Sequence, residues 1–123
     1  MAGMFSNCFS LNSLDLNNFD TTYVKNMSEL FQNCPGLSQL DVSKFSTSNV
    51  EDMSKMFEDC ISLVSLDVSK FDTKNVKDMS KMFSGCINIE VLDVNKFDTS
   101  KVKKISQMFQ KYEFFKKFGY FKF

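Results

Sequence analysis

Four cysteines recur along this chain at a spacing of 26 residues, and thiols are reactive groups with several possible uses. They are Cys8, Cys34, Cys60 and Cys86. Such a set could bind zinc, form disulfides between adjacent copies of a repeat, or lie buried as small apolar side chains. Zinc needs ligands that converge on one point, whereas residues at one position of a stacked repeat lie in a row. The row favours buried thiols, so we expect no metal site and no cofactor.

Catalysis by these thiols is not expected either. The chain contains no His, so no imidazole is present to activate a nucleophile or to act as a base. Carboxylates are abundant, but nothing in the sequence marks one of them as having a distinct environment. The sequence therefore predicts a protein that is not an enzyme.

A second row consists of aspartates, Asp15, Asp41, Asp67 and Asp93. Neighbouring carboxylates about 5 Å apart repel by roughly 0.8–3 kcal/mol, depending on the effective dielectric constant. Three uses of these aspartates remain open. They can form a polar row whose charges are offset by nearby Lys and Ser side chains, or a surface that binds a partner. They can also bind calcium, although the sequence lacks the glycine-rich loops usual at such sites. The residues of the candidate partner-binding face are Ser13, Asp15, Asn17, Gln39, Asp41, Ser43, Ser65, Asp67, Ser69, Val91, Asp93 and Asn95.

The apolar residues ahead of each cysteine predict a helix. In the third copy they recur at spacings of three and four, which is typical of an amphipathic helix. These residues are Val50, Met53, Met56, Phe57 and Cys60. Asn49 and Asp52 stand where a helix N-terminal capping pair would stand, and Asn75 and Asp78 repeat the arrangement.

The aspartates lie in a segment with a different period. Leu66 and Val68 alternate with Ser65, Asp67 and Ser69, which predicts a short, half-exposed strand. Residues 72–75 then read as a polar turn. Strand, turn and helix together make one coil of a stacked α/β solenoid, and identical coils should place like residues next to one another.

We therefore expect a single repeat domain over residues 1–123. Its coils lie near 1–26, 27–52, 53–78 and 79–104, with a partial, aromatic closing coil over 105–123. Stacking is essential to this expectation, since the apolar residues of one coil cannot offset the cost of ordering its backbone.

The strings MFEDCISLVSLDVSKFDTKNVKDMSKMF and MFSGCINIEVLDVNKFDTSKV resemble the BspA-like leucine-rich repeat family. The resemblance covers essentially the whole chain. It implies a right-handed, leucine-rich-repeat-like solenoid of about four to five coils with a parallel sheet on one face. It also implies a segment of a surface or secreted protein that takes part in adhesion and protein binding.

Charge and hydropathy narrow the range of partners. Residues 1–100 hold eight lysines against fourteen acidic residues, whereas residues 101–123 hold seven lysines against Glu113. This balance argues against nucleic-acid binding by the array. No apolar stretch is long enough for a transmembrane helix, and residues 1–14 follow the repeat instead of resembling an export signal.

The segment 109–123 combines aromatic residues with lysines. Most of its aromatics follow the core positions of the repeat, as expected for a closing coil or a truncated array. Phe114 and Phe121 do not, because their counterparts are Asn88 and Asn95. These two residues are candidates for self-association, and contact with nucleic acid or a membrane surface is a further alternative.

Two functions follow as hypotheses. The first is a non-enzymatic protein-binding module, adhesin-like by resemblance, that contacts a protein partner of unknown identity through the polar face. The second is a structural spacer or incomplete array that self-associates through its ends. The similarity of successive polar faces favours the second hypothesis, because a dedicated site usually interrupts a repeated pattern.

Overall fold

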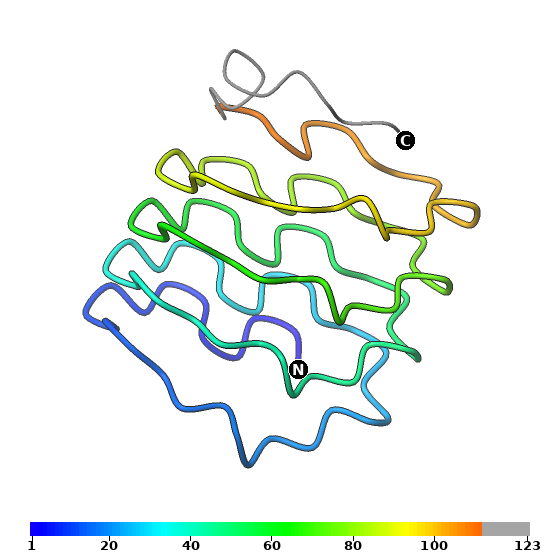
Figure 1. The fold of residues 1–123 in the computed structure, drawn as a ribbon, viewed down its shortest axis with the longest axis horizontal. Coiled ribbons are helices and arrows are strands. Elements are labelled where there is room, and N and C mark those ends of the chain that lie inside the picture. Colours follow the sequence, from blue (N-terminus) through cyan, green and yellow to red (C-terminus); the bar gives the residue numbers. More distant parts are fainter. Residues whose placement is uncertain (112–123) are drawn as a thin grey trace.

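Successive coils of the chain stack on one another in a computed structural model that describes residues 1–111 (Figure 1). Parallel bridges join Asn26 to Asp52, Asp52 to Asp78, and Asp78 to Lys104. Each bridge spans 26 positions, so one sequence repeat corresponds to one coil. The partial closing coil beyond residue 111 lies outside the described residues.

The expected α/β solenoid, with one helix and one strand per coil, is wrong. Residues 1–111 contain no helix and no strand that belongs to a sheet. Their only β pairing consists of isolated parallel bridges, the fourth of which joins Ser65 to Val91. The right-handed leucine-rich-repeat-like architecture with a parallel sheet on one face is therefore not the architecture of this part of the chain. The described residues also offer no helix that could cross a membrane.

The segments expected to be helical instead pair with the next coil. The amides of Met53, Lys55 and Phe57 donate to carbonyls 25 residues ahead, at 2.9–3.0 Å. Equivalent bonds link all the consecutive coils, and we call this series the backbone ladder. A helix would direct these amides to carbonyls four residues back along the same segment, so the backbone ladder and a helix exclude each other.

Tight turns between the ladder bonds explain why the pattern looked helical. The Met56 amide bonds to the Met53 carbonyl, and the Glu58 amide bonds to the Lys55 carbonyl. Lys55 and Asp59 have φ of 56° and 57°, in the left-handed region that interrupts a right-handed helix. Because these left-handed residues are four positions apart, each short turn returns its apolar side chains to the same side, as a helix would.

The left-handed positions form two columns that run through the coils. The first contains Gly3, Glu29, Lys55, Lys81 and Gln107, and the second contains Asn7, Asn33, Asp59, Gly85 and Lys111. The second column holds Asn, Asp or Gly in four of its five positions, which are the residue types that tolerate this conformation best.

The expected capping residues link coils instead of starting helices. The Asn49 side-chain amide donates to the Thr22 carbonyl at 2.7 Å, and Asn75 does the same to Ser48 at 2.8 Å. The Asp52 carboxylate accepts the Ser54 amide at 2.9 Å and so closes a local turn. The same short polar side chains suit a cap or an irregular turn, which is why the sequence pattern was ambiguous.

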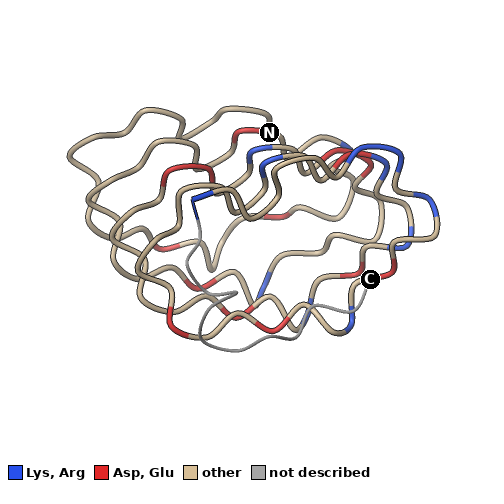
Figure 2. Ribbon diagram, turned by 90° about the horizontal axis from the view of Figure 1, so that it is seen from above, with Lys and Arg blue, Asp and Glu red and all other residues tan. Residues whose placement is uncertain are grey.

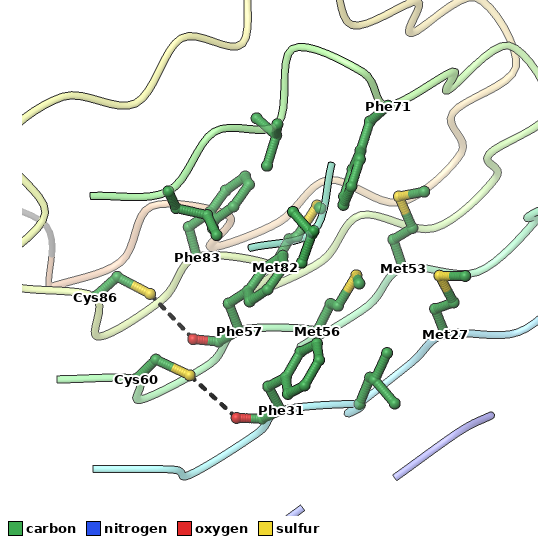
Figure 3. Close-up of a cluster of buried hydrophobic side chains, with 14 of the residues drawn as sticks. Met27, Phe31, Met53, Met56, Phe57, Cys60, Phe71, Met82, Phe83 and Cys86 are labelled. Atoms are coloured by element: carbon green, nitrogen blue, oxygen red, sulfur yellow. Dashed lines mark hydrogen bonds between the residues drawn. The ribbon is translucent and has the colours of Figure 1, made fainter. Parts of the chain in front are cut away.

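An aromatic stack runs through the core beside the backbone ladder. The rings of Phe5, Phe31, Phe57, Phe83 and Phe109 lie 5.6–5.8 Å apart between consecutive centroids and are nearly parallel. The three inner rings are fully buried. Methionine side chains from the same segments pack around them (Figure 3). The repeated apolar residues therefore do form a continuous core.

In the segment that leads into the backbone ladder, threonine hydroxyls link consecutive coils. The Thr47 hydroxyl donates to the Asp72 carbonyl at 3.1 Å and accepts the Asp72 amide at 2.8 Å. Thr21 and Thr73 make the same pair of bonds to the next coil, and all three threonines are buried. A hydroxyl between two backbones keeps them farther apart than a direct N–H···O bond does, so these backbones do not pair directly at the threonine row.

Candidate binding face

The residues proposed from the sequence as a binding surface lie next to one another on consecutive coils. We call them the front face, with the twelve members Ser13, Asp15, Asn17, Gln39, Asp41, Ser43, Ser65, Asp67, Ser69, Val91, Asp93 and Asn95. All are exposed except Ser69, which is half-buried. Between them, Leu16, Val42, Leu66 and Val68 point into the core. The alternation of inward and outward side chains is present even though no sheet forms.

Each aspartate of the front face is held by a turn within its own coil. Asp41 Oδ1 accepts the Ser43 amide at 2.9 Å, and Asp67 Oδ1 accepts the Ser69 amide at the same distance. The Ser43 hydroxyl and then the Ser43 amide lower the pKa of Asp41, and Lys44 adds a smaller effect in the same direction. The pKa of Asp67 is lowered in the same way by Ser69. These carboxylates are therefore ionised near neutral pH.

The main chain of the front face is largely unpaired. Within residues 1–111, the amides and carbonyls of Gln39, Leu40 and Asp41 make no hydrogen bond to the protein. The same holds for the amides and carbonyls of residues 13–15, whereas the third coil is paired at Ser65, which bridges to Val91. On the side of the backbone ladder, by contrast, the alternate amides bond to the next coil. The front face is thus the side on which peptide groups remain available to a partner.

Two clefts lie between neighbouring coils of the front face. The first, of about 360 Å³, lies between residues 13–17 and residues 39–41. The second, of about 260 Å³, lies between residues 65–68 and residues Val91 and Asp93. The Glu90 amide bonds to the Val64 carbonyl at 3.0 Å and ties together the coils that form the second cleft. The first cleft has no such tie among the described residues.

The cysteine row is structural. The thiols of Cys34, Cys60 and Cys86 donate to the carbonyls of Phe5, Phe31 and Phe57, at 3.0–3.1 Å. Figure 3 shows the bonds made by Cys60 and Cys86. All four cysteines are free, and only Cys8 is not buried. Burial raises the pKa of Cys60 and raises that of Cys86 to about 12. These thiols therefore stay protonated and serve as hydrogen-bond donors between coils, in the buried environment that the sequence favoured.

Ionic contacts also run from coil to coil outside the front face. Lys55 pairs with Glu29 at 2.9 Å, and Lys77 pairs with Glu51 at 2.6 Å. Figure 2 shows acidic and basic positions recurring along the stack. No group of three or more His, Cys, Asp or Glu side chains within the described part of the chain could hold a metal ion.

Two features of the surface were missed from the sequence. One is the buried threonine row. The other is an exposed apolar row beside the front face, formed by Phe9, Ile61 and Ile87, which are 62%, 40% and 53% exposed. Both follow the 26-residue period, although Pro35 occupies the position of the apolar row in the second coil, so the period could have revealed them. Phe114 and Phe121, the candidates for self-association, lie outside the described residues.

Comparison with known proteins identifies a family. No curated protein and no solved structure matches the chain. Residues 1–119 match the family described as "Mycoplasma protein of unknown function, DUF285". This match spans nearly the entire sequence, so the chain is a member of that family.

Proposed function

We propose that this chain is a non-enzymatic repeat module that binds a protein through the front face. The observation that carries the proposal is the unpaired main chain of residues 13–15 and 39–41 within the described part of the chain, exposed between rows of polar side chains. Peptide groups that lack internal partners are available to hydrogen-bond to another polypeptide. Because polar side chains line the front face on every coil, the face offers an extended contact surface and not a single pocket.

The chemistry of the side chains supports binding more than catalysis. The carboxylates of Asp41 and Asp67 are each bonded to the serine two residues later in their own coil, and the pKa of each is lowered. General acid–base catalysis by two carboxylates needs environments that separate their pKa values. The buried thiols have pKa values raised by burial, which disfavours the thiolate that a nucleophile requires.

The resemblance to BspA-like repeats adds a cellular location to the proposal. The module is then a segment of a surface or secreted adhesin-like protein, and its partner is a protein outside the cell. The front face supplies the polar contact area for such an encounter.

A second candidate, a structural spacer that self-associates through the ends of the stack, is favoured by one observation. Met4 is 51% exposed, whereas Leu30, Met56 and Met82 at the same position of later coils are fully buried. An exposed end of an apolar column can be covered by another stack. Light scattering of the purified chain tests this candidate, since a monomer over a wide concentration range would contradict it.

Substitution on the front face tests the first candidate. Asp41→Ala and Asp67→Ala should weaken the binding of any protein captured by the immobilised chain, because each removes an exposed charge and a turn that shapes the face. Asp20→Ala is the matched control. Asp20 is exposed and accepts the Thr22 amide at 3.0 Å in an equivalent turn, but it lies off the front face. Equal capture by all three variants and the unmodified chain would favour the spacer.

A further inference from the structure

In the first cleft of the front face, unlike the second, main-chain amides and carbonyls on both walls lack hydrogen-bond partners among the described residues. One wall is formed by residues 13–17 and the other by residues 39–41. Ser13, Leu14 and Asp15 on one side, and Gln39, Leu40 and Asp41 on the other, have amides and carbonyls without partners within residues 1–111. In the second cleft the Ser65–Val91 bridge and the Glu90–Val64 bond draw the walls together. The first cleft is accordingly the larger of the two.

Unpaired peptide groups on both walls select for a ligand that carries a main chain. A segment in extended conformation presents amides and carbonyls along both of its edges, so it can bond to one wall or to both. The cleft is also lined by Leu14, Leu16 and Leu40, of which Leu16 is buried and the other two are half-buried. Apolar and polar positions thus alternate along the walls, which suits a strand whose side chains alternate in the same way.

The charge of the first cleft favours a basic ligand. Asp15 and Asp41 both line it, and the Ser43 hydroxyl and amide keep the pKa of Asp41 below its ordinary value. Coils two to four carry Lys44, Lys70 and Lys96 just beyond the front face, but coil one has Asn18 at that position. One wall of the first cleft therefore lacks the lysine that accompanies the aspartate on every later coil.

From these observations we propose that the first cleft binds a basic polypeptide segment in extended conformation, through main-chain hydrogen bonds to residues 13–15 and 39–41. The inference rests on the proposed function and specifies its mode: the partner adds a strand to the first cleft and places Lys or Arg side chains near Asp15 and Asp41. The main chain supplies affinity, and the two carboxylates select the charge of the segment.

Fluorescence anisotropy with short labelled peptides tests this mode directly. The probes are a peptide of alternating Lys and Thr, the same peptide N-methylated at alternate residues, and a peptide of alternating Glu and Thr. The Lys peptide should bind, the Glu peptide should not, and N-methylation should weaken binding at least about tenfold, since it removes several hydrogen-bond donors at once.

Charge variants locate the binding site. Asp15→Asn should weaken binding of the Lys peptide about fivefold or more, because Asn removes the charge but keeps an oxygen that can accept the Asn17 amide. The matched control is Asp20→Asn, five residues away on the same coil, which should leave binding unchanged. Amide-exchange spectra of both variants check that the fold is retained.

Three outcomes would overturn the inference. They are equal binding of the N-methylated and unmodified peptides, equal weakening by Asp15→Asn and Asp20→Asn, and no binding of the Lys peptide at millimolar concentration. Competition separates this inference from the proposed function. If Asp41→Ala abolishes capture of a protein that the Lys peptide does not displace, the front face binds proteins but not by strand addition.

Discussion

The threonine row, formed by Thr21, Thr47 and Thr73, provides a sharp test of how consecutive coils are linked ahead of the backbone ladder. Thr47 is 2% exposed, and its hydroxyl pairs with both the amide and the carbonyl of Asp72. Thr47→Val keeps the shape of the side chain but removes both hydrogen bonds. A buried peptide group left without a partner costs about 1–3 kcal/mol, so we expect unfolding to become easier by about 2 kcal/mol.

Urea denaturation followed by circular dichroism measures this effect. For a chain of this size, a slope of about 1–3 kcal/mol per molar urea converts the loss into a midpoint lower by about 1 M. Thr47→Ser retains the hydroxyl and loses one methyl group, so it should cost only about 1 kcal/mol. The control Thr22→Val removes an exposed hydroxyl bonded to Asp20 and should change stability by less than about 0.5 kcal/mol.

The order of stability of these variants tests whether the Thr47 hydroxyl links the coils. If Thr47→Val were as stable as the unmodified chain, or more stable than Thr47→Ser, the hydroxyl would not link the coils.

Three further predictions concern the turns, the thiols and the carboxylates. Gly85→Ala should destabilise the fold by about 1–2 kcal/mol or more, because φ at Gly85 is 77° and the new Cβ would approach the Asp59 Cα to 3.2 Å. Thermal melts should show a smaller loss when Asp59→Gly is also present, and identical losses in the two backgrounds would contradict the contact. Among the four thiols, Cys8 should react with a thiol reagent in the native state, whereas Cys86 should react only on unfolding. The pKa of Cys86 is raised from 9.0 to about 12, so stability should fall as pH rises above about 9, where only the unfolded chain ionises; a flat profile up to pH 11 would refute this. Conversely, the pKa of Asp41 is lowered below 3.8, so its contribution is present above pH 3.8 and is lost as pH falls below that value; the Asp41→Asn variant should lose less stability on acidification than the unmodified chain.

The period of the sequence was sufficient to predict the core. Phe57 and Cys60 lie buried next to their counterparts on adjacent coils, as the 26-residue spacing indicated. The spacing could not distinguish a helix from a series of tight turns, because both return apolar side chains to one side about every four residues. The clue to the turns was the column that contains Asn33, Asp59 and Gly85, since these residue types favour the left-handed region.

The candidate binding face was only partly predictable. The exposure of Asp41 and Asp67 followed from alternation with buried residues and is confirmed. The unpaired main chain could not be predicted, because it depends on the distance between coils. The bonds from Thr47 to Asp72 could not be predicted either. The 26-residue recurrence of the threonines marks a row, but it does not show that their hydroxyls bridge two coils.

Hydrogen exchange of individual amides, measured by NMR, tests the central claim most directly. The claim is that consecutive coils pair through the backbone ladder and leave the front face unpaired. We predict slow exchange at Met53, Lys55 and Phe57, whose amides bond to the next coil, and fast exchange at Leu40 and Asp41, whose amides have no partner among the described residues. Slow exchange at Leu40 and Asp41, together with fast exchange at Lys55, would place the pairing on the front face and contradict the account.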